Sequence, residues 1–135
     1  MRGEASMPPR VGRVLLVDDN DRYADAITRH LQRRGADVER ARSAEEGICA
    51  LRERASSFGC VITDITMESQ LSGLRVLRKA RRLGFEGLLV TASTGPDNPV
   101  GYLFNRFLLG TLYGCDYVIP KRPIKRRGKV AWIRS

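Results

Sequence analysis

Three apolar runs that end at polar or acidic residues constrain the fold of this chain more than any other feature. They are RVLLVDDN from Arg13, CVITD from Cys60 and GLLVTAS from Gly87. A short continuous apolar run of this kind is typical of a strand buried on both faces, as in a parallel sheet. The sequence therefore predicts parallel strands whose carboxyl ends carry the polar chemistry.

Helical periodicity separates these runs. Asn20 or Asp21 is expected to cap a helix that reaches about Arg34, and Gly35 to end it. Ser43 and Glu46 have the spacing of a capping box for a second helix. Strand and helix alternate five times, which predicts an α/β fold, a doubly wound five-stranded parallel sheet with helices on both faces. The other predicted elements are strands at 37–41 and 116–120 and helices from about 73 to 83 and 99 to 112.

Length and composition fit one domain. The chain has 135 residues, of which 42% are hydrophobic and 29% charged. No apolar run approaches the roughly 20 residues that span a bilayer, and the first ten residues lack the apolar core of a signal peptide. We expect a flexible leader at 1–10, a cytoplasmic location and no membrane contact.

The cysteines and the histidine do not suggest a site. Cys49, Cys60 and Cys115 are widely spaced and form no Cys-x-x-Cys pair, so we expect buried small side chains and neither a disulfide framework nor zinc. His30 lies within a helical pattern and is expected on the helix surface.

Five polar residues fall at or just beyond the predicted strand ends, where open parallel sheets bind ligands. They are Asp18, Asp19, Asp64, Thr91 and Lys121. Three converging carboxylates repel one another, so a bound cation is expected, and oxygen ligands of this kind favour Mg²⁺ or Mn²⁺. A lysine and a threonine beside them can bind phosphoryl oxygens.

In this order the motifs VLLVDDN, VITDITM and LLVTAS, followed by Lys121, resemble the receiver domains of two-component signalling. The resemblance covers about residues 13–121 and implies a receiver domain at 11–123 with the flavodoxin-like strand order 2-1-3-4-5. It implies a stand-alone phosphoacceptor of a phosphorelay, CheY-like, and not an enzyme beyond metal-dependent self-phosphorylation and dephosphorylation. Its partners would be a histidine kinase or phosphotransfer protein and a downstream protein.

The resemblance also assigns roles. Asp64 would be the phosphorylated nucleophile, Asp19 a direct Mg²⁺ ligand and Asp18 a ligand through water. The carbonyl of Thr66 would complete the protein ligands. Thr91 and Lys121 would hold the phosphoryl oxygens, so that the protein contributes positioning and charge neutralisation.

Several positions depart from the family pattern. Glu68 stands where the family has proline, and Arg122 separates Lys121 from Pro123. The position of the family's switch aromatic holds Val118, while Tyr117, one place earlier, should face the other side of the sheet. The helix predicted at 99–112 is apolar and aromatic enough for either core packing or a partner surface.

The segment after Lys121 is short, basic and broken by Pro123 and Gly128, so the family's last helix is expected to be short or missing. Residues 121–135 hold seven of the 24 basic residues and no acid. We interpret 124–135 as a basic C-terminal tail, a solvated arm or a segment that binds nucleic acid or a nucleotide.

Two functions compete. The acidic site favours a phosphorylated signalling receiver, whereas the missing switch aromatic and last helix favour a receiver-like binding module that works through its basic tail. A metal-dependent phosphatase is a weaker third hypothesis, because Thr66 stands where such phosphatases have a second acidic residue.

Without a last helix, part of the apolar sheet face would be bare. Either the tail folds back over it or a second subunit covers it, and we expect a homodimer. The tail side chains able to cover it are Ile124, Val130, Trp132 and Ile133.

Overall fold

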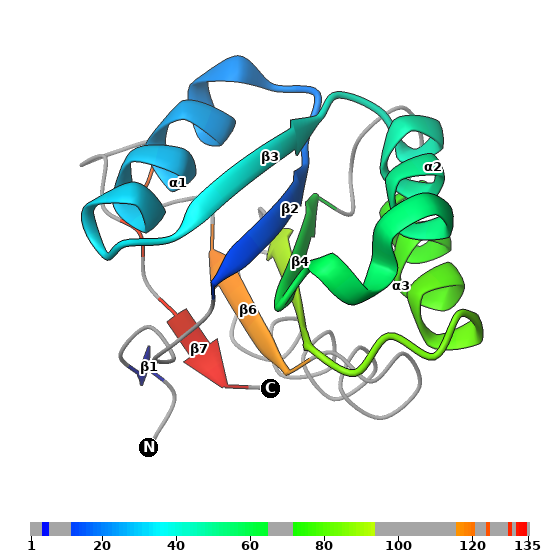
Figure 1. The fold of residues 1–135 in the computed structure, drawn as a ribbon. Coiled ribbons are helices and arrows are strands. Elements are labelled where there is room, and N and C mark those ends of the chain that lie inside the picture. Colours follow the sequence, from blue (N-terminus) through cyan, green and yellow to red (C-terminus); the bar gives the residue numbers. More distant parts are fainter. Residues whose placement is uncertain are drawn as a thin grey trace.

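The computed structural model describes residues 4–5, 12–64, 72–93, 116–120, 124, 130 and 132–134, in which strands and helices alternate (Figure 1). The first half contains β1 (Glu4–Ala5), β2 (Arg13–Val17), α1 (Asp21–Arg33), β3 (Asp37–Ala41), α2 (Ala44–Arg54) and the short 3-10 helix η1 (Ala55–Ser57). The second half contains β4 (Cys60–Asp64), α3 (Ser72–Arg82), β5 (Leu88–Ser93), β6 (Tyr117–Pro120) and β7 (Trp132–Arg134).

The described strands form one sheet in the order β1-β7-β6-β5-β4-β2-β3. Five of these strands, β6, β5, β4, β2 and β3, are parallel to one another. Numbered among themselves they have the order 2-1-3-4-5, so the predicted fold class and strand order are confirmed. The sheet has two further strands that the sequence did not predict, because β7 and β1 join antiparallel beyond β6.

The alternation of side chains along each buried strand divides the core into two layers. Leu15, Val61 and Leu89 pack on the side of α2 and α3. Val14, Ile62 and Val90 pack on the side of α1. Figure 1 shows α1 on one face of the sheet and α2 with α3 on the other. The apolar runs of β2 and β4 are buried on both faces for this reason.

The helix boundaries follow from local hydrogen bonds that the sequence predicted. Asn20 caps α1, and its side-chain oxygen accepts a hydrogen bond from the Tyr23 amide at 3.2 Å. Gly35, with φ of 86°, follows the helix in the left-handed conformation that glycine adopts without strain. Ser43 caps α2 by accepting from the Glu46 amide at 3.1 Å. These caps fix where the loops at the strand ends begin.

The described residues of the C-terminal segment pack on the sheet. β7 pairs with β6, and the side chains of Ile124, Val130 and Trp132 are buried in the core layer beside α1. Trp132 is 1% exposed and meets Tyr117 edge to face, with ring centroids 5.9 Å apart. These side chains of the chain itself therefore cover part of the sheet face beside α1. The expected leader also contributes, since Glu4–Ala5 pairs with β7.

Two expectations about single residues were wrong. His30 is 7% exposed rather than on the surface, because Trp132 packs against α1 from the sheet side. Cys49 is exposed on α2, whereas Cys60 is buried as expected. Several predicted features lie outside the described residues. They are Cys115, the helix predicted at 99–112, the Glu68 and Arg122 positions and most of 121–131.

None of the described helices is both long enough and apolar enough to span a membrane.

Candidate functional site

Three carboxylates lie together at the carboxyl ends of β2 and β4. Asp18 directly follows β2, and Asp64 is the last residue of β4. The two strands are neighbours with Val17 opposite Thr63, so Asp18 and Asp64 lie at the same level of the sheet. Asp18, Asp19 and Asp64 each offer a carboxylate oxygen, and these oxygens lie within 4.8 Å of one another. The sequence predicted this convergence, and the structure shows it.

The three carboxylates differ in how far they are buried. Asp18 is 0% exposed and Asp64 2%, whereas Asp19 is exposed. Two carboxylates held next to each other out of water are costly unless a cation or a donor compensates them. The exposed Asp19 places one side of the cluster in contact with solvent. The close approach of the three negative charges is therefore unfavourable without a cation, and the cluster is open to a small ligand.

The loop that carries Asp18 and Asp19 is fixed by backbone contacts. The Asp18 amide donates to the Ala41 carbonyl at 3.0 Å, which ties the end of β2 to the end of β3. The Asn20 amide donates to Asp18 Oδ1 at 2.9 Å, so one carboxylate oxygen is oriented by the start of α1. Asp18 thus has a defined orientation before any ligand binds.

Arg40 is a supporting residue that sequence reasoning missed. Its Nε and Nη2 donate to the Asp18 carbonyl at 3.1 and 2.9 Å, and its Nη1 pairs with Asp21 Oδ1 at 2.7 Å. Arg42 Nη1 also pairs with Asp21 Oδ1, at 2.7 Å. The hydrogen bonds from Arg40 and Arg42 lower the pKa of Asp21. An arginine in a half-exposed strand has no sequence signal that would distinguish it from a solvated one.

Thr91 lies on the next strand. It is fully buried in β5, opposite Thr63 of β4, while Asp64 is opposite Ala92. Thr91 is therefore one register position before Asp64, and β5 continues two residues beyond it to Ser93. Thr63, also buried, donates from Oγ1 to the Asp64 carbonyl at 3.4 Å. Thr66 and Lys121, the other two predicted site residues, lie outside the described residues.

The donor set fits a hard divalent cation. All three groups offer carboxylate oxygens, the ligands that Mg²⁺ and Mn²⁺ prefer. Oxygens bound to one Mg²⁺ at about 2.1 Å lie no more than about 4.2 Å apart. A spread within 4.8 Å is close to that limit, so small side-chain movements bring the set together.

Comparison with known proteins agrees with this geometry. The sequence model of the response regulator receiver domain matches residues 14–102, which is more than half of the chain. The chain belongs to the response regulator receiver domain family. It is therefore a signalling module of the kind used in two-component systems. The matched span contains Asp18, Asp19, Asp64 and Thr91.

A curated relative and several solved structures show the same relationship. The chain is 28% identical over 125 residues to a transcriptional regulatory protein CpxR homologue of Haemophilus influenzae, covering 93% of this chain and 50% of that protein. The chain thus spans about half the length of this relative. A receiver domain from Clostridium thermocellum is 27% identical with a TM-score of 0.68, over 82% of both chains. A CheY-like receiver from Methanospirillum hungatei is 25% identical with a TM-score of 0.64, over 83% of this chain and 82% of that one.

Proposed function

We propose that this receiver domain is a phosphoacceptor of a phosphorelay and that Asp64 takes the phosphoryl group. The observation that carries the proposal is the position of Asp64, which ends a buried strand within 4.8 Å of the carboxylate oxygens of Asp18 and Asp19. A carboxylate is a known covalent phosphoryl acceptor. An acid with a structural role alone would not need two further acids beside it.

Asp18, Asp19 and Asp64 would hold Mg²⁺ or Mn²⁺, and the family resemblance adds the carbonyl of Thr66. When bound, the cation supplies charge neutralisation for the carboxylates and for an incoming phosphoryl group. Arg40 and the Asn20 amide keep Asp18 oriented in the absence of that group. The protein therefore supplies a preformed ligand set at the end of the sheet.

In the reaction an oxygen of Asp64 forms a bond to phosphorus. The bond from phosphorus to the donor breaks, a P–N bond for a phosphohistidine or a P–O bond for acetyl phosphate, and the donor leaves with that electron pair. Thr91 and Lys121 would bind the phosphoryl oxygens, as the family resemblance implies, and Thr91 lies in β5, the strand next to that of Asp64. Positioning and electrostatics account for the catalysis that such a transfer needs.

The proposed donor is a histidine kinase or a phosphotransfer protein, and the proposed output is binding of a downstream protein. The domain would work in the cytoplasm, where such donors have access to it. It would perform no chemistry other than its own phosphorylation and dephosphorylation.

Intact-mass measurement after incubation with Mg²⁺ and acetyl phosphate tests the proposal. The wild type should gain one acid-labile phosphoryl group and Asp64→Asn should gain none. Asp25→Asn, which removes an exposed carboxylate on α1, should be phosphorylated like the wild type. An unchanged wild-type mass, with Mg²⁺ binding demonstrated by calorimetry, would reject Asp64 as a phosphoacceptor.

A further inference from the structure

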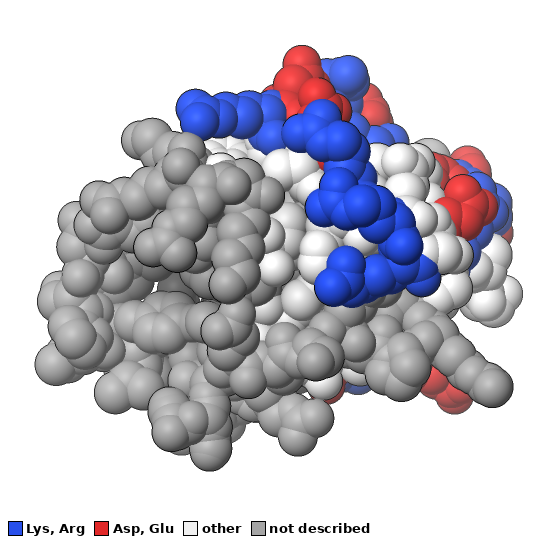
Figure 2. Space-filling model, turned by 90° about the vertical axis from the view of Figure 1, so that its left-hand side faces the viewer, with Lys and Arg blue, Asp and Glu red and all other residues white. Residues whose placement is uncertain are grey.

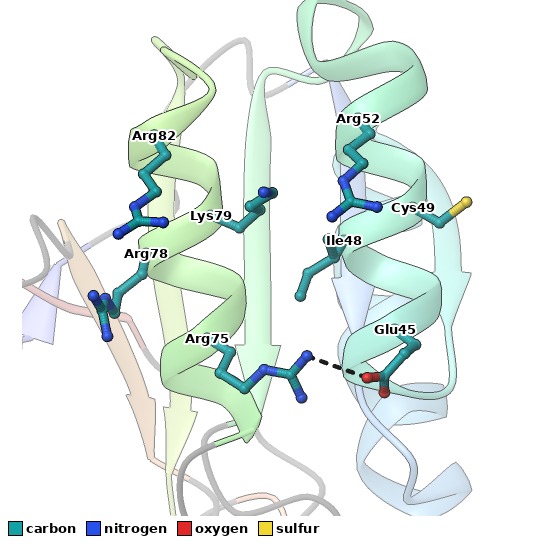
Figure 3. A pocket seen from close by; sticks show the side chains of 8 residues that line it. All are labelled: Glu45, Ile48, Cys49, Arg52, Arg75, Arg78, Lys79 and Arg82. Carbon is teal, nitrogen blue, oxygen red and sulfur yellow. Dashed lines mark hydrogen bonds and ion pairs between the residues drawn. The ribbon is translucent and has the colours of Figure 1, made fainter.

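A groove with strong positive charge lies between α2 and α3, on the sheet face opposite α1. It encloses about 390 Å³, and Figure 3 shows the side chains that line it. In Figure 3, Arg52 extends from α2 toward Lys79 of α3, and Ile48 lies below Arg52 on α2. Arg78 and Arg82 extend from the side of α3 that is turned away from α2. Its five cations are Arg52, Arg75, Arg78, Lys79 and Arg82, and its one acid is Glu45.

Most of this charge has no anionic partner among the described residues. Arg75 pairs with Glu45 at 3.1 Å. No carboxylate of the described ranges lies within ion-pair distance of Arg52, Arg78, Lys79 or Arg82. Within the part of the chain that the structure describes, the groove therefore retains about four positive charges that an external anion can neutralise.

The composition of α3 makes this charge unusual. The helix has the sequence SGLRVLRKARR, with five basic residues and no acid. Several of these cations are three or four residues apart, where like charges destabilise a helix. A surface helix whose only task is to cover the sheet would gain stability from interspersed acids, as α2 has in Glu45, Glu46 and Glu53.

The lining favours a polyanion over a protein partner. Stable protein interfaces need an apolar centre with few charges, whereas Ile48 and Cys49 are the uncharged residues of this groove. Four of its five cations are arginines, whose planar guanidinium groups match phosphate oxygens. The lining residues include no aromatic side chain on which a base could stack.

We propose that the α2–α3 groove binds the phosphate backbone of single-stranded nucleic acid, without base specificity. A groove of about 390 Å³ has room for a short stretch of one backbone and is too small to enclose a duplex. This binding does not require phosphorylation of Asp64, and Asp64→Asn should bind like the wild type.

Fluorescence anisotropy with a labelled oligodeoxythymidylate measures the binding over a range of salt concentrations. With about four contacts the wild-type log affinity should fall by about 3 for each log unit of salt. Replacing Arg78, Lys79 and Arg82 by glutamine should reduce that slope by about 2, and should weaken binding at 0.1 M salt by about a hundredfold. Arg52→Gln, which changes the α2 side of the groove, should reduce the slope of log affinity against log salt by about 0.7.

Two variants with the same loss of charge serve as controls. Arg29, Arg33 and Arg34 are exposed on and after α1, and the α1 side of the molecule also carries a band of basic side chains (Figure 2). Lys125, Arg126 and Arg127 belong to the basic C-terminal segment. Replacing either set by glutamine should leave the salt slope close to the wild-type value. Unfolding followed through the fluorescence of Trp132 verifies that each variant is folded.

Four outcomes would overturn the proposal. The first is a wild type that does not bind at low salt, and the second is a groove variant that binds like the wild type. The third is an equal loss in either control variant, which would place the binding on α1 or in the C-terminal segment. The fourth is a duplex or polyglutamate that binds as tightly as the single strand at equal charge concentration.

Discussion

Trp132 Nε1 donates a buried hydrogen bond of 2.9 Å to His30 Nε2, joining β7 to α1 across 102 positions of sequence. The indole N–H can only donate, so His30 Nε2 must be an acceptor and the imidazole must be neutral. Burial, followed by the charges of Arg34 and Arg33, lowers the pKa of His30 from 6.5 to about 4. The contact holds the end of the chain against the helix that begins beside Asp18 and Asp19.

Acid should weaken this contact. The unfolded chain takes up the His30 proton near pH 6.5 and the folded chain only near pH 4, so stability should fall as the pH is lowered through this interval. We expect a loss on the order of 1–2 kcal/mol, after discounting for partial solvent screening. His30→Gln retains an acceptor but does not titrate. Measured by urea unfolding, the stability of His30→Gln should change less between pH 4 and 6.5 than that of the wild type if His30 is responsible.

Trp132→Ala should destabilise the domain by about 3–5 kcal/mol, because it removes a large side chain that is 1% exposed. Trp132→Phe should cost less, since most of the apolar contact remains while the hydrogen bond to His30 is lost. Chemical denaturation followed by far-UV circular dichroism measures both. Equal stability of Trp132→Ala and wild type would show that β7 does not contribute to the core.

Asp19→Ala should weaken Mg²⁺ binding by about tenfold or more, since it removes one of the three carboxylates that the described residues bring together. Calorimetric titration measures the affinity directly. Asp25→Ala removes a carboxylate of α1 that is outside the cluster and should leave the affinity unchanged. If Asp19→Ala bound Mg²⁺ as well as the wild type, the assignment of Asp19 as a ligand would be wrong.

Arg40→Gln should reduce Mg²⁺ affinity by about tenfold, through the loss of the two hydrogen bonds that hold the Asp18 carbonyl. Arg42→Gln removes the same charge and also loses an ion pair to Asp21, but it leaves the two Arg40 hydrogen bonds to the Asp18 carbonyl in place. It should therefore bind Mg²⁺ almost normally. Similar losses in both variants would indicate a general effect of charge rather than positioning by Arg40.

Gly87→Ala should destabilise the fold by about 1–3 kcal/mol. A Cβ at Gly87 would lie 2.8 Å from the backbone carbon of Gly59 and closer still to its carbonyl oxygen, which accepts a hydrogen bond from Leu88. The backbone cannot move away without disturbing the pairing of β4 with β5. Glu86→Ala, at the exposed neighbouring position, is the control and should change the thermal midpoint little.

The sequence determined the layered fold and the acidic centre because both depend on local patterns. The apolar runs that end at Asp18 and Asp64 are typical of buried strands, and the carboxyl ends of parallel strands meet at one edge of a sheet. The caps at Asn20 and Ser43 were also readable, because a cap is a contact between residues three positions apart.

Tertiary structure alone decided the contacts between distant segments. Nothing near His30 or Trp132 in the sequence indicates that they meet, and the basic residues around Trp132 suggested a solvated arm. Arg40 was equally unreadable, because its importance comes from the carbonyl of a residue 22 positions away. The groove between α2 and α3 likewise exists only once both helices lie on the same face of the sheet. Such features depend on which surfaces the folded chain brings together, and local sequence does not encode that choice.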